Sequence, residues 1–445
     1  MRAEVAAAFE KVKARDPNQT EFLQAVEEVF DSLGPLFDKY PHYVKVLEAI
    51  CEPERVIQFR VPWLDDNNKM QVNRGFRVQF NQAIGPYKGG LRFHPSVNLS
   101  IIKFLGFEQI FKNALTTLPM GGGKGGSDFD PKGKSDAEVM RFTQSFMTEL
   151  SRYIGPDVDV PAGDIGVGGR EIGYMYGQYK RMQGDHSGVL TGKGHGWGGS
   201  LIRPEATGFG CVYALKNCVD EFGVSLEGKK VLISGSGNVA QYAAIKCKEF
   251  GAQVLTFSDS NGTIYEPNGF SDEQIQQVLD IKNNKRGRVA DYKSETVQFL
   301  KGTRPWGVGA ADVALPCATQ NEISKEDAES LIAAGVKYVF EGANMPSTPE
   351  AIEVFKRNKA VFFPAKAANA GGVAVSGLEM AQNSARYFWT RDEVDNKLKG
   401  IMASIWKACS ETAKELGHEG DYQLGANCAG FKIVADAMIA QGYVL

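Results

Sequence analysis

A single lysine stands among five glycines in residues 118–128, which read Leu-Pro-Met-Gly-Gly-Gly-Lys-Gly-Gly-Ser-Asp. Glycine permits positive φ and lets a ligand approach the backbone, so this segment is suited to presenting Lys124 to a small molecule. It is not a phosphate-binding Gly-x-x-x-x-Gly-Lys-Ser/Thr loop, because Leu118 replaces the first glycine and Gly125 replaces the hydroxyl residue. A buried lysine beside other cations would exchange protons near neutral pH, whereas a solvated lysine on a surface turn is the alternative.

Two more lysines occur in segments connected to this one. Lys88 lies among glycines, and Lys112 lies near the end of a helix that Asn98 can cap and that leads into the Lys124 segment. Gln109 lies three residues before Lys112, so the two side chains share a helix face. Three cations brought together would repel one another unless an anion lies among them. The pattern therefore indicates a substrate with more than one negative charge.

Asp164 is the single carboxylate of a second glycine-rich segment, residues 161–169. Aspartate commonly caps a helix, and a helix is predicted directly after this segment. Opposite a lysine with a lowered pKa, the same carboxylate would instead be a proton-transfer partner. The residues alone leave both roles open.

The composition is that of an ordinary globular protein. The chain has 445 residues, of which 43% are apolar and 23% charged, and this length predicts two or three domains. A formal net charge of -3 argues against nucleic acid or an anionic membrane as the main partner. No apolar run reaches the length of a membrane span, and the first residues do not read as a leader. The seven cysteines include no Cys-x-x-Cys pair, which predicts reduced thiols in a cytoplasmic protein and no metal site.

The N-terminal half reads as an α/β domain. Residues 1–50 carry helical apolar stripes, and residues 57–61 and 76–80 alternate apolar and polar side chains around a polar turn. The alternation predicts a hairpin in a half-buried sheet. Residues 192–199 contain five glycines and predict a domain boundary or hinge.

The second half contains a dinucleotide-binding βαβ unit. Residues 231–234 form a short apolar run typical of a buried parallel strand, and residues 235–240 follow it with Gly-x-Gly-x-x-Ala. A helix and a second strand, residues 253–257, come next. In this context the glycines let a pyrophosphate lie at a helix N-terminus. Further strands are predicted at residues 312–315, 338–340 and 361–363.

Two sets of residues give opposite indications of the cofactor. Asp259, 24 residues after Gly235, would accept a hydrogen bond from the ribose 2′-OH of NAD. Ser260 and the basic residues at 282–288 would instead suit the 2′-phosphate of NADP. The basic residues could equally form a solvated helix end.

Taken together, these segments resemble the hexameric glutamate dehydrogenases of the Glu/Leu/Phe/Val dehydrogenase superfamily over nearly the whole chain. The matching segments are residues 85–95, 107–112, 119–128, 159–169, 234–240, 341–346 and 367–380. The resemblance implies an α/β fold of two domains with a cleft between them. The first, with a mixed sheet, would cover residues 1–200 and a C-terminal helix at 420–445 and serve substrate binding and oligomerisation. The second, of Rossmann type, would cover residues 201–419 and bind the dinucleotide.

The resemblance also implies a role for individual residues. Lys124 would be the catalytic lysine and Asp164 its proton-transfer partner. Four residues would bind the two carboxylates of the substrate. Lys88 and Ser376 would bind the side-chain carboxylate, and Gln109 and Lys112 would bind the α-carboxylate. Cofactor binding would fall to Thr207, Gly235, Ser236, Gly237, Asn238, Val239, Asp259, Ser260, Lys282, Arg288 and Asn344.

The resemblance implies a homohexamer that converts L-glutamate to 2-oxoglutarate and ammonium with NADP, and the reduced cysteines predict that it is cytoplasmic. Two other enzymatic functions are possible interpretations. The first is the same reaction with NAD or with both cofactors, and the second is a leucine-type dehydrogenase that acts on apolar amino acids. The pair Lys88 and Ser376 argues against the leucine type, because an apolar side chain needs no cation. A dinucleotide-binding sensor without turnover is a third reading, and the presence of both Lys124 and Asp164 argues against it.

Overall fold

The computed structural model describes residues 2–442, which form two compact α/β units. The first unit contains residues 2–201, 375–394 and 427–442, and the second contains residues 202–374 and 395–426. The two-domain α/β fold predicted from the sequence is confirmed. Residues 375–394 lie in the first unit, although the sequence placed them with the dinucleotide-binding part. None of the helices in the described part of the chain is long and apolar enough to cross a bilayer.

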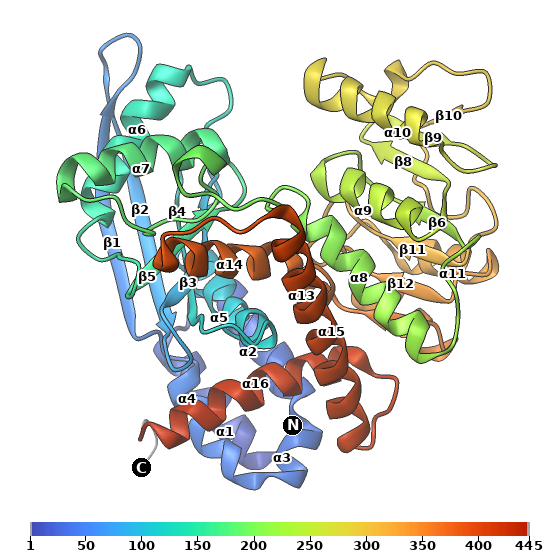
Figure 1. Cartoon of the computed structure of the whole chain (residues 1–445). Helices are drawn as coiled ribbons and strands as arrows, with labels where there is room; N and C mark the ends of the chain where they lie inside the picture. Colours follow the sequence, from blue (N-terminus) through green and yellow to red (C-terminus); the bar gives the residue numbers. More distant parts are fainter. Residues whose placement is uncertain (1, 443–445) are drawn as a thin grey trace. The chain divides into compact units, whose positions relative to one another are not determined.

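Helices from both ends of the chain form one layer of the first unit (Figure 1). The C-terminal helix α16 (Tyr422–Ala440) packs its Phe431 edge-on against Phe37, with ring centroids 5.8 Å apart. Tyr43 donates a hydrogen bond of 2.6 Å to Asp436 of the same helix. The N-terminal elements of this layer are α1 (Ala3–Arg15), α2 (Thr20–Ser32), α3 (Gly34–Lys39), η1 (Pro41–Val46) and α4 (Leu47–Ile50).

A five-stranded mixed sheet is the centre of the first unit, in the order β1-β2-β4-β3-β5. Neighbours β1, β2 and β4 are antiparallel, whereas β3 runs parallel to both β4 and β5. The strands are β1 (Arg55–Leu64), β2 (Met70–Asn81), β3 (Tyr87–Phe93), β4 (Gly122–Ser127) and β5 (Asp159–Gly163).

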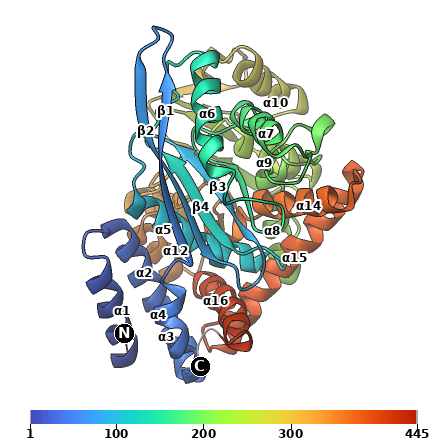
Figure 2. The ribbon, with the colours of Figure 1, turned by 90° about the vertical axis from the view of Figure 1, so that its left-hand side faces the viewer.

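Helices cover both faces of this sheet. On one face, α6 (Asp136–Leu150) and α7 (Gly169–Gln183) pack a cluster of buried aromatic and aliphatic side chains against β1 and β3. Figure 2 shows these two helices lying together beside the strands. On the other face, α5 (Leu99–Leu115) approaches so closely that a Cβ on Gly106 would lie 3.2 Å from the Phe80 ring. The predicted cap is present, since Asn98 caps α5. Ser135 forms a capping box with Glu138 at the start of α6.

The predicted hairpin is confirmed, but the half-buried sheet is wrong for the second half of β2. Residues 75–81 are all buried, including Arg77 and Gln79, which the alternation had assigned to a polar face. The Arg77 guanidinium makes two hydrogen bonds to Asp159, of 2.8 and 2.5 Å, and Gln79 donates a third of 3.0 Å. A polar face can therefore be buried here because its charges are paired.

The second unit contains a parallel sheet in the order β13-β12-β11-β6-β7. Helix α8 (Ala206–Glu221) crosses α9 (Asn238–Glu249) at Gly208, where a Cβ would lie 2.6 Å from backbone atoms of α9. The strands are β6 (Lys230–Ile233), β7 (Gln253–Val254), β11 (Val313–Leu315), β12 (Tyr338–Phe340) and β13 (Val361–Phe363). The other helices that surround it are α11 (Lys325–Ala333), α12 (Pro349–Arg357), α13 (Ala365–Ala368) and α15 (Arg391–Glu415).

The strand predicted at residues 253–257 is in fact two strands in two sheets. It breaks at Leu255, and β8 (Thr256–Asp259) joins a small antiparallel sheet with β9 (Gly262–Tyr265) and β10 (Gln298–Lys301). Asp259 therefore ends a strand that belongs to a side layer, which also contains α10 (Asp272–Leu279) and the π-helical turn η3 (Asp280–Asn284).

We expect Arg77→Met to destabilise the protein strongly. The substitution leaves the Asp159 carboxylate buried without its cation, which costs about 3–5 kcal/mol in unfolding free energy. The control is Lys13→Met, which breaks an exposed helix pair with Glu10 and costs less than about 1 kcal/mol. Guanidinium-induced unfolding followed by circular dichroism measures both, and equal midpoints for the two variants would contradict the role of Arg77.

Candidate active site

The Lys124 side chain meets Asp164 on the sheet of the first unit. Lys124 lies in β4, opposite Gly90 of the parallel neighbour β3, and its ammonium is 3.2 Å from Asp164 Oδ2. Asp164 follows β5 directly, and β5 pairs with the other edge of β3. Two strand registers thus bring residues 40 positions apart into contact. The exposed fractions of the two side chains are 8% and 17%.

Glycine makes room for this ion pair. A Cβ at Gly90 would lie 2.8 Å from the Asp164 Cβ and 3.3 Å from the Lys124 ammonium. On the other side of Lys124, a Cβ at Gly106 of α5 would lie 3.6 Å from the Lys124 Cβ. A larger residue at position 90 would push the carboxylate and the ammonium apart.

The surroundings of the pair favour an ionised carboxylate and a lysine that gives up its proton readily. Burial lowers the pKa of Lys124 below its ordinary value of 10.5, Asp164 opposes this shift, and Arg92 adds to it. Burial alone would raise the pKa of Asp164, but Lys124 and Arg92 outweigh it, so the net pKa is lowered. Arg92 donates a hydrogen bond of 3.0 Å to Asp164 Oδ2. The same surroundings therefore lower both pKa values, that of Lys124 through burial and that of Asp164 through its two cationic neighbours.

The helix cap considered for Asp164 is wrong. Helix α7 begins at Gly169, and its N-cap is Gly168, whose N–H donates to Glu171. The Asp164 side chain contacts Lys124 and Arg92 instead. The proton-transfer role of Asp164 stays a prediction.

Helix α5 is fixed to the same strands through Asn113. Its amide donates to the backbone carbonyls of Lys88 and Gly121, at 3.0 and 2.6 Å, and accepts a hydrogen bond of 2.7 Å from Gln109. Gln109 therefore lies beside the strand that carries Lys88. Lys112 lies next to Asn113 on the same helix, and the meeting of its ammonium with those of the other two lysines stays a prediction.

Lys88 points to the same side of β3 as Gly90, because alternate residues of a strand share a face. The residue is 1% exposed, and its ammonium donates a hydrogen bond of 2.8 Å to the Thr191 hydroxyl. Ser376 lies in α14 (Gly371–Ala385), is 2% exposed, and precedes Gly377. A Cβ at Gly377 would lie 2.6 Å from Leu118, so this turn of α14 packs on the segment leading into β4.

The second unit has the features of a dinucleotide-binding turn. Gly235 adopts φ +85°, and a Cβ there would lie 2.9 Å from the Cys317 carbonyl. Its N–H donates to Ser258 in the next strand, which holds the turn. Gly237 then caps α9, so the backbone N–H groups of Asn238 and Val239 lie in the first turn of a helix. Such a turn is suited to a pyrophosphate, and the buried Ser236 belongs to it.

Four residues that the sequence associated with the cofactor ribose lie together. Lys282 is 3.4 Å from Asp259 Oδ2, and Arg288 donates a hydrogen bond of 3.3 Å to the Ser260 hydroxyl. Asp259 also accepts the N–H of Val289 at 2.9 Å. The carboxylate is therefore largely engaged by the protein, which reduces its availability to a ribose hydroxyl and leaves a basic, hydroxyl-bearing surface beside it.

Two other residues with predicted cofactor roles occupy different elements of this unit. Thr207 lies in the first turn of α8, and its hydroxyl would be 2.6 Å from a Cβ at Gly372 of α14. Asn344 follows β12, and its side-chain oxygen accepts a hydrogen bond of 2.8 Å from Asn369. Both side chains are thus held by neighbouring segments of the second unit.

Several residues of the site escaped the sequence reasoning. Arg92 lies in a segment that had been singled out, yet its contact with Asp164 follows only from the parallel register of β3 and β5. Thr191 carried no motif at all. The alternation of β3 and the count of residues beyond β5 would have pointed to Arg92, whereas nothing in the sequence pattern indicates Thr191.

No group of three or more possible metal ligands exists within residues 2–442. The seven cysteines are buried free thiols. Burial raises the pKa of Cys247 to about 12, so this thiol stays protonated.

A Rossmann-type unit joined to a unit with a buried lysine–carboxylate pair defines a class of nicotinamide-linked dehydrogenases. The family model "Glu/Leu/Phe/Val dehydrogenase, dimerisation domain" matches residues 53–181, and "Glutamate/Leucine/Phenylalanine/Valine dehydrogenase" matches residues 198–442. The chain belongs to this Glu/Leu/Phe/Val dehydrogenase family.

Named relatives are similar over nearly their full length. The NADP-specific glutamate dehydrogenase of Giardia intestinalis is 62% identical over 97% of each chain, and that of Escherichia coli K12 is 60% identical over 97% of each. The crystal structure of Plasmodium falciparum glutamate dehydrogenase superposes with a TM-score of 0.97 at 56% identity, covering 99% of this chain and 94% of that one.

We expect the protonation of Lys124 to respond in opposite directions to its two charged neighbours. The neutral amine forms as pH rises through the lysine pKa, which lies below 10.5. Arg92→Met removes a cation and should move the transition to higher pH, whereas Asp164→Asn removes the carboxylate and should move it lower.

Competitive labelling with acetic anhydride between pH 6 and 11, read by peptide mass spectrometry, measures this transition. Exposed Lys69 serves as the internal control, and its labelling curve should be the same in all three proteins. A Lys124 curve that moved in the same direction in both variants would refute the electrostatic assignment.

Proposed function

We propose that the protein is an NADP-dependent glutamate dehydrogenase that converts L-glutamate, water and NADP to 2-oxoglutarate, ammonium and NADPH. The observation that carries the proposal is the ammonium of Lys124 held against Asp164 at 3.2 Å, on the strand next to Lys88. The family supplies the reaction class, and the relatives of 60% identity or more carry this name. The residues supply the chemistry.

The substrate is held at both ends in this proposal. Lys88 and Ser376 bind the side-chain carboxylate of glutamate, and Gln109 and Lys112 bind the α-carboxylate. Buried Lys88 supports this assignment, because a carboxylate brought to a cation on a residue that is only 1% exposed is bound strongly. Two fixed carboxylates leave Cα in one orientation, which lowers the entropic cost of the reaction.

The proton transfers fall to Lys124 and Asp164. A bound NADP would supply the acceptor for the hydride of Cα, and loss of this hydride would leave the substrate as an iminium. Neutral Lys124 then removes a proton from the water that adds to this carbon, and as an ammonium it stabilises the resulting hydroxyl group. Asp164, which is ionised, takes this proton from the Lys124 ammonium 3.2 Å away and passes it to the nitrogen. As the C–N bond breaks and ammonia leaves, neutral Lys124 takes the proton of the hydroxyl group, whose oxygen becomes the carbonyl of 2-oxoglutarate, and this proton then converts the ammonia to ammonium. The lowered pKa of Lys124 supports this role, because an ordinary lysine would hold its proton throughout.

The second unit selects NADP over NAD through the basic group around Ser260. Lys282 and Arg288 supply charge for a 2′-phosphate, while Asp259 is engaged by Lys282 and by the Val289 N–H. A relative named NAD(P)-specific glutamate dehydrogenase, from Xylanibacter ruminicola, is 58% identical. Use of both cofactors is therefore the second candidate, and Gly235, Ser236, Gly237, Asn238, Val239, Thr207 and Asn344 would serve either one.

Two further properties are proposed from the family. The protein assembles as a homohexamer, and it works in the cytoplasm on glutamate, 2-oxoglutarate and ammonium. Oxidation of NADPH in the presence of 2-oxoglutarate and ammonium tests the activity, and parallel assays with NADH measure the cofactor preference. A protein that binds NADPH but does not oxidise it would support the sensor reading instead.

We expect Lys88→Leu combined with Ser376→Val to shift the enzyme from glutamate toward apolar amino acids. Loss of the charge-assisted bonds to the side-chain carboxylate should lower kcat/KM for glutamate by about 10²-fold or more, given about 1.5–3 kcal/mol per bond. Activity with norvaline should rise. Steady-state kinetics with both substrates measure the change, with Lys69→Leu as a surface control, and unaltered glutamate kinetics would refute the assignment.

We expect Lys282→Glu with Arg288→Glu to weaken NADP binding far more than NAD binding. The reversal places two carboxylates beside the 2′-phosphate, so KM for NADP should rise by at least about tenfold relative to KM for NAD. The matched control is Lys285→Glu with Arg286→Glu, which makes the same charge change in the same segment. Equal losses with both cofactors would mean that the two residues do not bind the phosphate.

A further inference from the structure

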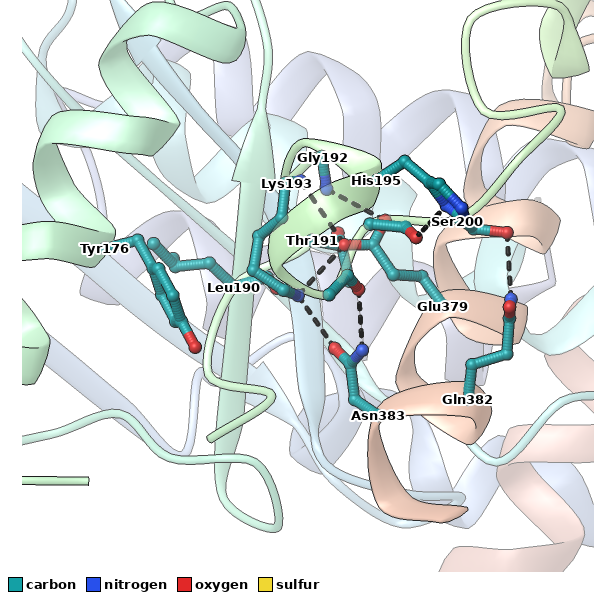
Figure 3. A network of polar contacts seen from close by, with 12 residues as sticks. Tyr176, Leu190, Thr191, Gly192, Lys193, His195, Ser200, Glu379, Gln382 and Asn383 are labelled. Atoms are coloured by element: carbon teal, nitrogen blue, oxygen red, sulfur yellow. Dashed lines mark hydrogen bonds and ion pairs between the residues drawn. The ribbon is translucent and has the colours of Figure 1, made fainter. Parts of the chain in front are cut away.

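A second buried ion pair, separate from that of Lys124 and Asp164, links two parts of the first unit. Lys193 donates a hydrogen bond of 2.9 Å to Glu379 of α14, 186 residues further along the chain, and the side chains are 1% and 0% exposed. The Lys193 ammonium also donates to the Leu190 carbonyl and, at 2.7 Å, to Asn383. Figure 3 shows the ammonium pointing between these partners. Each of its three protons has an acceptor, so this lysine has none left for a ligand.

The same carboxylate fixes the backbone that precedes Lys193. Glu379 accepts the N–H of Gly192 at 3.1 Å and the N–H of Lys193 at 3.3 Å (Figure 3). Residues 192–199, which the sequence predicted as a hinge, are thus anchored to α14 at this end. Asn383 adds a hydrogen bond of 2.7 Å to the Gly198 carbonyl.

Glu379 connects the surroundings of Lys88 to those of Ser376, the two residues proposed to bind the side-chain carboxylate. Thr191, the residue before Gly192, accepts a hydrogen bond from the Lys88 ammonium and is itself fully buried. Ser376 lies three residues before Glu379, so the two share one side of α14. Glu379 therefore ties the helix that carries Ser376 to the loop that orients Lys88.

We propose that Lys193 and Glu379 are a positioning pair for substrate specificity, which holds Lys88 and Ser376 at the spacing required by a distal carboxylate. The proposal rests on the proposed function, because it assigns that subsite to a dicarboxylic substrate. Neither residue of the pair touches the substrate. Their effect is transmitted through Thr191 on one side and through one turn of α14 on the other.

The alternative is that the pair only stabilises the fold. Apolar residues of similar volume often replace a buried ion pair without loss of stability, so stability alone does not require two charges here. Hydrogen bonds to Glu379 fix direction as well as distance, and three of them converge on its two oxygens. Directional bonds of this kind define a geometry that apolar packing would leave loose.

The test compares two variants of the full-length enzyme. Lys193→Met with Glu379→Leu replaces the pair by apolar side chains, and Glu379→Gln keeps the shape and one backbone acceptor but removes the charge. The readout is the ratio of kcat/KM for 2-oxoglutarate to kcat/KM for 2-oxopentanoate, which lacks the distal carboxylate. KM for NADPH and for ammonium is measured alongside.

In the double variant we expect this ratio to fall by about tenfold, the effect of losing one bond to a charged group. In Glu379→Gln it should fall by about threefold, because one N–H acceptor remains. KM for NADPH and for ammonium should stay within about twofold of the wild type. A purely structural role would reduce the amount of active enzyme and leave the ratio unchanged.

The matched control is Gln382→Met, on the same helix. It removes hydrogen bonds from α14 to Ser200 and to the Trp389 N–H, but no bond to residues 191–193, which include the contact with Lys88. Its ratio should equal that of the wild type. An equal fall in this control, or an unchanged ratio in the Glu379 variants, overturns the proposal.

Failure of the proposed function gives a different result. Wild-type protein without turnover of 2-oxoglutarate would refute the function before any variant is compared. Wild-type turnover with an unchanged ratio in Glu379→Gln refutes only the positioning pair, and this variant decides the question if the double variant does not fold.

Discussion

The ion pair between Lys124 and Asp164 places an ammonium and a carboxylate 3.2 Å apart, both largely removed from water. Taking charges out of water costs several kcal/mol per ion. The attraction between the two ions offsets this cost only if further hydrogen bonds satisfy their remaining donors and acceptors. Asp164 has such a bond from Arg92. Lys124 has one acceptor among the described residues, and burial lowers its pKa although Asp164 opposes the shift.

The surrounding sheet is built to tolerate this arrangement. A strand of sequence Gly-Gly-Lys-Gly-Gly-Ser has little intrinsic β preference, yet β4 lies between β2 and β3, and all six of its residues are buried. Hydrogen bonds from both neighbours supply what the side chains do not. The absence of Cβ atoms lets α5 and β3 approach Lys124 closely, as the clash at Gly90 shows. Backbone pairing therefore carries the strand, and glycine leaves the space for chemistry.

Local patterns in the sequence were sufficient for most of the elements and for the Lys124 and Asp164 segments. The capping box at Ser135, the N-cap at Asn98 and the turn at Gly235 are determined by neighbours within a few residues. The buried Arg77 and the link from Lys193 to Glu379 depend on partners 82 and 186 residues away. The alternation of apolar and polar residues in a strand cannot distinguish a polar face that meets water from one that meets a buried carboxylate. These ion pairs therefore could not be predicted from the sequence pattern.

Arg77, Lys124 and Lys193 are all buried cations with a carboxylate partner, yet their remaining bonds differ. Arg77 binds Asp159 twice and also donates to the Gly89 carbonyl, and the three protons of Lys193 all have acceptors. Lys124, with its single acceptor in the described part of the chain, keeps two protons for something else. Saturated cations fix geometry, whereas an undersatisfied cation attracts a ligand or loses its proton. On this criterion Lys124 is the one suited to chemistry, and Arg77 and Lys193 are suited to holding the framework around it.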